Sequence, residues 1–134
     1  MFANGYGERL SSSESYKLKK RMLMDGFTKL YGMSFEKSIN MGADGMVRAL
    51  WSYETPIADY YVKRHEMYIS MDAFRCSNTT IRHFSEWLKL LGFDGYYHII
   101  KKAAMEQEKE MAKMYIFELT GEWYEVKGLR FTFI

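Results

Sequence analysis

The alternation of apolar and polar residues predicts a series of strands in the middle of this chain. Between residues 33 and 71 the alternation has a period of two, in the segments MSFEKSIN, MVRALWSY, TPIADYYV and MYISM. The segments GADG and KRHE read as turns, which indicates an antiparallel meander of three or four strands. The tail, KMYIFEL-TGEW-YEVKG-LRFTFI, predicts two or three more strands with turns at Gly121 and Gly128.

Helical spacing appears first near the N-terminus, after an irregular stretch over residues 1–10. A helix is expected over about 12–31, where Ser11 and Glu14 have the spacing of a capping box. Gly26 lies inside this segment and argues against one unbroken helix.

Residues 76–93, CSNTTIRHFSEWLKLLGF, contain the clearest helix, which we expect over about 79–91. Asn78 or Thr79 is placed to cap its first N–H groups, and Gly92 stands where a left-handed residue ends a helix. Its apolar stripe consists of Ile81, Phe84, Leu88 and Leu91. Another helix, over about 95–112, is expected to expose its charged second half.

Runs of strands and runs of helices, without strict alternation, predict an α+β fold. We expect a single domain over residues 1–134, with an antiparallel sheet and helices packed on one face of it.

Composition adds a question about the aromatic residues. They make up 17% of the chain, with 11 Tyr and 9 Phe, and there are 11 Met. Such residues either build the core or supply an interface, and the sequence leaves both readings open. The net charge of +2 does not by itself indicate a polyanionic partner, although it excludes an acidic mimic of DNA.

The single cysteine, Cys76, excludes an internal disulfide and fits a reducing cytoplasm. The N-terminal residues lack the apolar run of a signal peptide, and no segment approaches the length of a membrane span. We therefore expect a soluble intracellular protein that does not insert into a membrane.

The densest basic cluster is YKLKKR, residues 16–21. Lys17, Lys20 and Arg21 fall on one helical face that could lie along a phosphate backbone or an acidic protein surface. The alternative is an exposed, solvated helix face.

The beginning of the helix over 79–91 carries a second candidate surface. Free N–H groups and the positive end of the helix dipole attract anions there, and Thr80, Arg82 and His83 would strengthen this effect. The alternative is a cap whose polar residues face solvent.

Candidates for catalysis and metal binding are weak. His65, His83 and His98 show no ligand spacing, and Cys76 with His83 lacks a third group that would orient the base. We therefore expect no metal site, no cofactor and no catalytic residue.

Glu125 and Lys127 have the E-x-K spacing of metal-dependent nucleases of the PD-(D/E)xK type, with Asp59 as a conceivable upstream ligand. Asp59 lies far upstream, with two expected helices in between. An exposed strand face is the competing interpretation.

Two segments resemble a short module of small phage and prophage proteins. In that module a strand SY-x-TP-[IV]-A precedes a helix start TT-x-RH and an apolar helix that ends in FL or WL. The segments here are SYETPIADY, residues 52–60, and TTIRHFSEWL, residues 79–88, within a phage-like module of about 46–92. The matching residues are Ser52, Tyr53, Thr55, Pro56, Ile57, Ala58, Thr79, Thr80, Arg82, His83 and Trp87.

The resemblance implies an origin in a bacteriophage or mobile element, and hence a bacterial cytoplasm, but it assigns no catalytic residue. We expect a non-enzymatic accessory protein that binds and inhibits a bacterial defence protein or ribonucleoprotein, for example an anti-CRISPR acting on a Cas nuclease. Its contacts would be Lys17, Lys20, Arg21, Thr80, Arg82 and His83. The alternative is a phage regulator that binds nucleic acid. The sequence does not indicate an oligomeric state.

Overall fold

The computed structural model describes residues 10–113 and 122–134. Within these residues, seven strands form one sheet in the order β1-β2-β3-β4-β5-β7-β6. The strands are β1 (Thr28–Lys29), β2 (Ser34–Asn40), β3 (Met46–Ser52), β4 (Thr55–Tyr61), β5 (Glu66–Ile69), β6 (Tyr124–Val126) and β7 (Leu129–Phe133). The helices are α1 (Ser12–Met24), α2 (Asp72–Arg75), α3 (Asn78–Leu90) and α4 (Tyr96–Lys113), and a 3₁₀ turn, η1, spans Gly42–Asp44.

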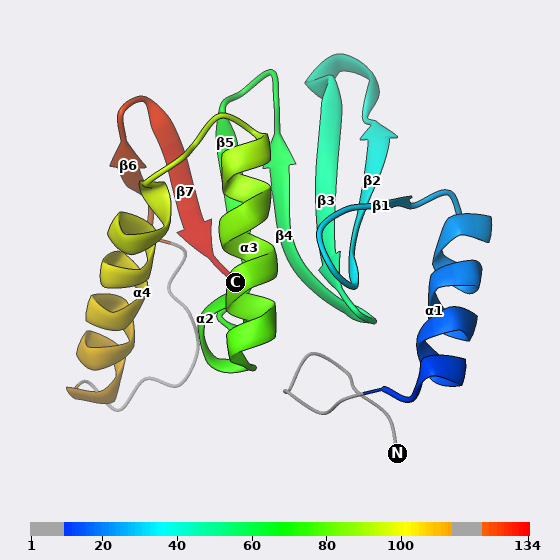
Figure 1. Cartoon of the computed structure of the whole chain (residues 1–134). Helices are drawn as coiled ribbons and strands as arrows, with labels where there is room; N and C mark the ends of the chain where they lie inside the picture. The colour runs from blue at the N-terminus through cyan, green and yellow to red at the C-terminus, as the bar shows by residue number, and fades with distance from the viewer. Residues whose placement is uncertain (1–9, 114–121) are drawn as a thin grey trace.

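The structure confirms the α+β class and the antiparallel meander. Strands β1 to β5 pair antiparallel with their neighbours, as does β6 with β7. The pair β5 and β7 is parallel, which the sequence did not predict. Helices α2, α3 and α4 pack on one face of the sheet (Figure 1).

The main hydrophobic core lies between these helices and the sheet. It contains Phe84, Trp87 and Leu88 of α3, each at most 1% exposed, together with Phe131 and Phe133 of β7. Much of the aromatic content is therefore core, although several tyrosines and a tryptophan are not.

Helix α1 packs on the other side of β2. Phe35 and Glu36 are consecutive strand residues, so their side chains point to opposite faces. Glu36 points towards α3, whereas Phe35 contacts a second, smaller cluster that includes Leu18 and Met22 of α1.

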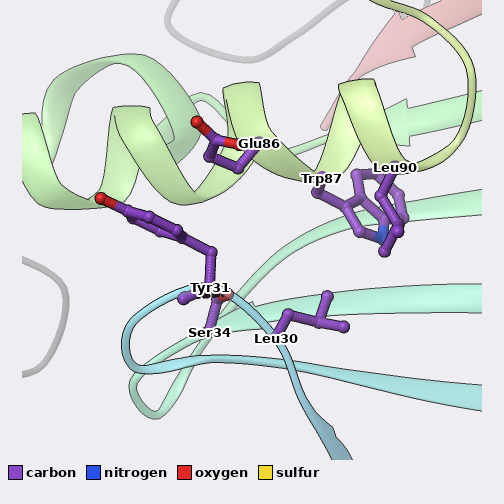
Figure 2. A pocket seen from close by; sticks show the side chains of 6 residues that line it. All are labelled: Leu30, Tyr31, Ser34, Glu86, Trp87 and Leu90. Atoms are coloured by element: carbon purple, nitrogen blue, oxygen red, sulfur yellow. Dashed lines mark hydrogen bonds between the residues drawn. The ribbon is translucent and has the colours of Figure 1, made fainter.

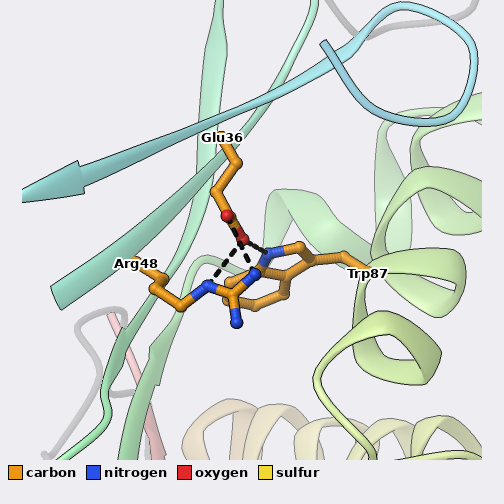
Figure 3. A network of polar contacts seen from close by, with 3 residues as sticks. All are labelled: Glu36, Arg48 and Trp87. Atoms are coloured by element: carbon orange, nitrogen blue, oxygen red, sulfur yellow. Dashed lines mark hydrogen bonds and ion pairs between the residues drawn. The ribbon is translucent and has the colours of Figure 1, made fainter. Parts of the chain in front are cut away.

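Figure 3 shows the buried polar group that ties α3 to the sheet. The Glu36 carboxylate accepts two hydrogen bonds from the Arg48 guanidinium, at 3.1 and 3.0 Å, and one from Trp87 Nε1, at 2.6 Å. Each carboxylate oxygen accepts from the Arg48 guanidinium and Oε2 accepts in addition from the Trp87 indole, so the carboxylate is well compensated for its burial.

Local capping signals set the ends of the helices, but two predicted details are wrong: the end of α1 and the cap of α3. The capping box of Ser11 and Glu14 is present, but α1 ends at Met24 instead of near residue 31. Gly26 has φ +90°, and the Phe27 N–H bonds back to the Met22 carbonyl at 3.1 Å, which closes the helix.

In α3 the cap is Ser77, not Asn78 or Thr79, because the Ser77 side chain accepts the Thr80 N–H. Gly92, at φ +92°, ends the helix as predicted, and the Phe93 N–H bonds to the Leu88 carbonyl at 2.7 Å.

Strands β6 and β7 confirm the last two strands predicted in the tail. Apart from Leu10 and Lys113, the irregular stretch expected over residues 1–10 and the strand expected in KMYIFEL lie outside the described residues. Among the described helices, none combines the length and the apolar character that crossing a membrane requires.

Candidate functional site

The fold brings the segments 52–60 and 79–88, which the sequence analysis grouped as one module, into contact. Ser52, the last residue of β3, lies against the first turns of α3. Its Oγ is 2.7 Å from His83 Nδ1 and 3.2 Å from Thr80 Oγ1. Residues about 30 positions apart in the sequence therefore form one polar cluster between the β3–β4 turn and α3.

This cluster is enclosed. Ser52 and Thr80 are 0% exposed and His83 is 1% exposed. The Ser77 hydroxyl extends the cluster by donating to Thr80 Oγ1 at 3.2 Å. Thr80 and His83, which the sequence analysis placed on a contact surface, thus point into the protein and hold α3 against the sheet.

A groove opens beside this cluster, and we call it the α3 groove. Its volume is about 620 Å³. It is lined by Tyr31, Gly32, Met33, Tyr53, Asn78, Thr79, Arg82 and His83. The Arg82 guanidinium lies 5.4 Å from the centre of the Tyr31 ring, so a cation–π pair forms part of the rim.

A smaller hollow of about 220 Å³ continues on the other side of Tyr31. Figure 2 shows Tyr31 reaching from the loop between β1 and β2 towards α3, while Trp87 and Leu90 reach down from the helix. Tyr31 therefore stands between the two hollows, where it is 46% exposed.

The floor of the groove is electrically neutral at pH 7. Burial lowers the pKa of His83 to about 4, and the positive charge of Lys29 contributes in the same direction. The His83 ring also packs against the rings of Tyr31 and Tyr53, at 6.3 and 5.7 Å between centres. A neutral, packed imidazole bonded to Ser52 serves here as a structural element.

This assignment predicts that stability falls as the pH is lowered from about 6.5 towards 4. In the unfolded chain His83 takes up a proton near its ordinary pKa of 6.5, whereas the folded protein resists protonation until about pH 4. The contribution of the neutral ring is complete above pH 6.5 and is lost through this interval. One pKa unit corresponds to about 1.4 kcal/mol, and we expect a loss of about 2 kcal/mol in total because the ring borders an open groove.

Urea unfolding of the protein and of a His83→Gln variant, each at pH 7 and pH 4.5, measures the contribution of His83 to the free energy of unfolding. The drop in stability should be smaller in the variant by about that amount, since glutamine does not titrate. An equal drop in both proteins would contradict the assignment.

The β3–β4 turn connects the groove to α1. Tyr53 adopts φ +53°, an uncommon conformation for a residue with a side chain. The next residue, Glu54, forms an ion pair with Arg21 at 3.1 Å, and both side chains are more than half exposed. Lys17 and Lys20 are exposed on α1. Arg21 thus contacts the β3–β4 turn through Glu54. The basic face of α1 is a separate surface from the α3 groove.

The residues considered for a nuclease site do not come together in the structure. Lys127 has φ +48° and belongs to the turn after β6, so it does not share a strand face with Glu125. Asp59 lies on β4, three strands from β6 and hence about 14 Å away at the usual spacing. The nuclease arrangement is therefore not formed.

In the thiol–imidazole candidate, Cys76 with His83, the His83 Nδ1 atom is already bonded to Ser52 at 2.7 Å, so this nitrogen is engaged in the polar cluster. No group of three His, Cys, Asp or Glu residues suited to a metal ion occurs among the described residues.

The sequence analysis proposed only Arg82 and His83 among the residues that line the groove, and it missed Tyr31, Gly32 and the Ser52 hydroxyl beneath them. Ser52 was visible as the first residue of the segment SYETPIADY, which the structure divides between the end of β3, a turn and β4. No sequence pattern marked Tyr31 or Gly32 as a site residue, because their role depends on where α3 docks.

Residues 11–107 include α1, the module and every residue of the α3 groove. Neither the curated proteins nor the solved structures contain a significant match to this chain. A family model does match over residues 11–107, and the chain therefore belongs to the family of unknown function DUF8033.

Proposed function

We propose that this protein is a phage or mobile-element accessory protein that binds and inhibits a bacterial defence effector in the host cytoplasm. A Cas nuclease is the first candidate, so the protein would be an anti-CRISPR, and its action would not involve catalysis. The observation that carries the proposal is the α3 groove, because both halves of the phage-like module build it. The module and the groove together support a role in binding.

The rim of the groove has the chemistry of an interface. Tyr31 and Arg82 are exposed and paired, and tyrosine and arginine are over-represented among residues that dominate binding energies. Beneath them the Ser52–His83 bond fixes the position of the α3 N-terminus. A surface held in place before binding loses little conformational entropy when a partner docks.

The enclosed polar cluster also supports binding in preference to hydrolysis. A serine bonded to a histidine is the beginning of a nucleophilic pair, but Ser52 is 0% exposed. Its hydroxyl cannot reach a substrate without displacement of α3. The partner contacts that remain from the sequence analysis are Arg82 on α3 and Lys17, Lys20 and Arg21 on α1.

The second candidate function is a phage regulator that binds nucleic acid through α1. The exposed Lys17 and Lys20 favour it, together with Arg21 when its pair with Glu54 opens. Affinity for DNA or RNA should then fall steeply with salt, and neutralising the three residues should weaken it. Absence of binding at low salt would exclude this function.

We expect Arg82→Ala to weaken binding to the effector by roughly 10- to 30-fold, which is the range for a residue at the centre of an interface. Candidate Cas nucleases and other defence nucleases of the host would be purified and titrated by biolayer interferometry, with a cleavage assay in parallel. Inhibition and affinity should decrease together.

Arg75→Ala is the matched control, because Arg75 is also an exposed helical arginine with one long ion pair, to Glu108 at 3.8 Å. It should bind as the unmodified protein does. If no defence nuclease of the host is bound or inhibited, the proposed function is wrong. If Arg75→Ala weakens binding as much as Arg82→Ala, the α3 groove is not the contact surface.

A further inference from the structure

The first turn of α3 presents two backbone N–H groups without an acceptor to the α3 groove. The Ser77 hydroxyl accepts the Thr80 N–H at 3.1 Å, and the Ser77 carbonyl accepts the Ile81 N–H at 3.0 Å. The N–H groups of Asn78 and Thr79 are left over, because a helix contains no partner for its first N–H groups. In the part of the chain that the structure describes, no loop or turn carbonyl accepts them. Both residues line the groove, which therefore receives the positive end of the α3 dipole.

Arg82 adds a full positive charge three residues after Thr79. Its guanidinium lies over the Tyr31 ring, and it forms no ion pair with a carboxylate of residues 10–113 or 122–134. Burial and the positive charge of Lys29 together lower the pKa of His83 at the groove floor, so Lys29 contributes to the same positive potential. No Asp or Glu occurs among the described residues that line the groove. An anion in the groove thus meets cations and N–H groups but no carboxylate of the lining.

The buried His83 ring brings one more polar atom to the groove. Nδ1 is bonded to Ser52 at 2.7 Å, whereas Nε2 has no hydrogen-bond partner within the described residues. Nε2 faces Gly32, where a Cβ would lie only 2.9 Å away, so the absence of a side chain at this position leaves room beside the nitrogen. When the Ser52 hydroxyl donates to Nδ1, Nε2 carries the proton and can donate to a ligand. A side chain that is 1% exposed ordinarily has its polar atoms paired, and this nitrogen indicates a ligand in the groove.

Acidic residues flank the groove on two sides and limit the kind of anion that fits. Glu54 lies in the β3–β4 turn, and Glu86 of α3 lines the smaller hollow. Each is paired with one cation, Arg21 at 3.1 Å and Lys89 at 3.8 Å, so neither flank offers net positive charge. A nucleic acid strand carries a phosphate at every nucleotide and would need cations along its path. The charge pattern is therefore that of a site for a single negative group.

The smaller hollow beside the α3 groove is apolar. Its lining includes Leu30, Trp87 and Leu90, and Tyr31 stands between it and the α3 groove (Figure 2). Leu90 is 56% exposed, so an apolar side chain bound here would remove apolar surface from water. A free inorganic anion would leave this hollow unused. A peptide, in contrast, can place a carboxylate in one hollow and an apolar side chain in the next.

We propose that the α3 groove binds an acidic peptide segment of the partner protein. The carboxylate of one Asp or Glu accepts hydrogen bonds from the Asn78 and Thr79 N–H groups and from the Arg82 guanidinium. His83 Nε2 is a further donor from the floor. An apolar side chain near that acid in the peptide fills the smaller hollow. This assignment rests on the proposed function, because it names the part of the effector that the groove contacts.

Fluorescence anisotropy with synthetic peptides tests the proposal without any nuclease. The peptides are acetylated and amidated and carry an uncharged dye, so that one Glu supplies their only charge. A Leu stands one to four residues from the Glu in a Gly-Ser background, and each peptide has a twin with Gln in place of Glu. We expect the best Glu peptide to bind at least about 10-fold more tightly than its Gln twin, because charge-assisted hydrogen bonds are lost in the twin. Replacing the Leu with Gly should weaken binding by roughly 10-fold.

Asn78→Pro tests the backbone donors directly, because it removes one of the two free N–H groups. Proline is tolerated at the first residue of a helix, and Ser77 before it is extended, at φ −164° and ψ 164°, as a residue before proline prefers. Asn78→Ala is the matched control, since it changes the side chain and keeps the N–H. We expect Asn78→Pro to bind the Glu peptide about 10-fold more weakly than Asn78→Ala does, with equal affinity of both for the Gln peptide. Circular dichroism confirms that each variant is folded.

Arg82→Ala should reduce the preference for Glu over Gln at least about 10-fold, whereas Arg75→Ala, outside the groove, should keep it. The proposal is overturned if no Glu peptide is preferred over its twin, or if Arg75→Ala loses the preference as Arg82→Ala does. It is also overturned if inorganic phosphate or oligo(dT) displaces the Glu peptide at a lower concentration than unlabelled peptide does. A Gln peptide with a free C-terminus that binds as tightly as the Glu peptide would assign the groove to a chain end instead.

The peptide measurements and the nuclease measurements fail separately. A preference for Glu without binding of any defence nuclease leaves the peptide site in place and rejects the proposed function. Inhibition of a nuclease without a preference for Glu leaves the proposed function in place and rejects the peptide site.

Discussion

Replacing Glu36 with alanine is expected to lower the free energy of unfolding by about 3–5 kcal/mol. The change removes the acceptor for both the Arg48 guanidinium and the Trp87 indole N–H. Trp87 is 1% exposed, so its N–H would stay buried without a partner, at a cost of about 1–3 kcal/mol. Arg48, with 31% of its side chain exposed, would retain a partly desolvated charge.

Urea unfolding at pH 7, followed by circular dichroism, measures this loss. Glu54→Ala serves as the control, because it breaks an ion pair of similar length, 3.1 Å, whose side chains are more than half exposed. We expect that control to change stability by less than about 1 kcal/mol. A double variant, Glu36→Ala with Arg48→Ala, should lose less than the sum of the single changes, since it leaves no unpaired charge. Equal effects of Glu36→Ala and Glu54→Ala would show that the buried group does not hold α3.

The elements that the sequence predicted well are those whose signals are local. The stripe of α3 and its Gly92 stop depend on residues within one helix, and the structure confirms both. The alternation in MYISM placed Met67 and Ile69 on one face, and both are 0% exposed in the core. Period and turn chemistry decide such features without reference to the rest of the chain.

The end of α1 was misjudged because two local signals disagree. Apolar residues continue at helical spacing through Leu23, Phe27 and Leu30, but the left-handed conformation of Gly26 stops the helix before the last two. Leu23 is 44% exposed, and the buried face passes instead through Leu18 and Met22. The conformational freedom of glycine outweighed the periodic pattern.

Whether the side chains at the start of α3 are buried or exposed was not predictable from the sequence. Polar residues in a first helical turn ordinarily cap the helix or face water. Thr80 and His83 are instead buried, because β3 supplies the Ser52 hydroxyl and the loop before β2 supplies Gly32. That arrangement depends on the docking of α3, which is a long-range property.

The parallel pairing of β5 with β7 is also a long-range property, and it decides which residues lie beside Tyr68 of β5. The pairing sets Glu66 beside Arg130 and Tyr68 beside Thr132. Trp123 reaches Tyr68 because β6 continues this part of the sheet. A reading of single strands identifies which face Tyr68 takes but not its neighbours.

Gly32→Ala is expected to lower the free energy of unfolding by about 2–3 kcal/mol and to disturb the α3 groove. Gly32 has φ +57°, a left-handed conformation that costs a residue with a Cβ about 1–2 kcal/mol. The added Cβ would lie 2.9 Å from His83 Nε2. His83 cannot yield easily, since it is 1% exposed and bonded to Ser52 at 2.7 Å. The strain is therefore expected to add to the conformational cost.

Gly42→Ala separates the two costs, because Gly42 has φ +65° but its Cβ would meet nothing within 4 Å. It should lose only the conformational part, about 1–2 kcal/mol, in urea unfolding at pH 7. Combining Gly32→Ala with His83→Ala should cost less than the sum of the two single changes, because the contact that strains the backbone is gone. If Gly32→Ala and Gly42→Ala are equally destabilising, His83 is free to move, and the floor of the α3 groove is not the fixed support that its packing against Ser52 implies.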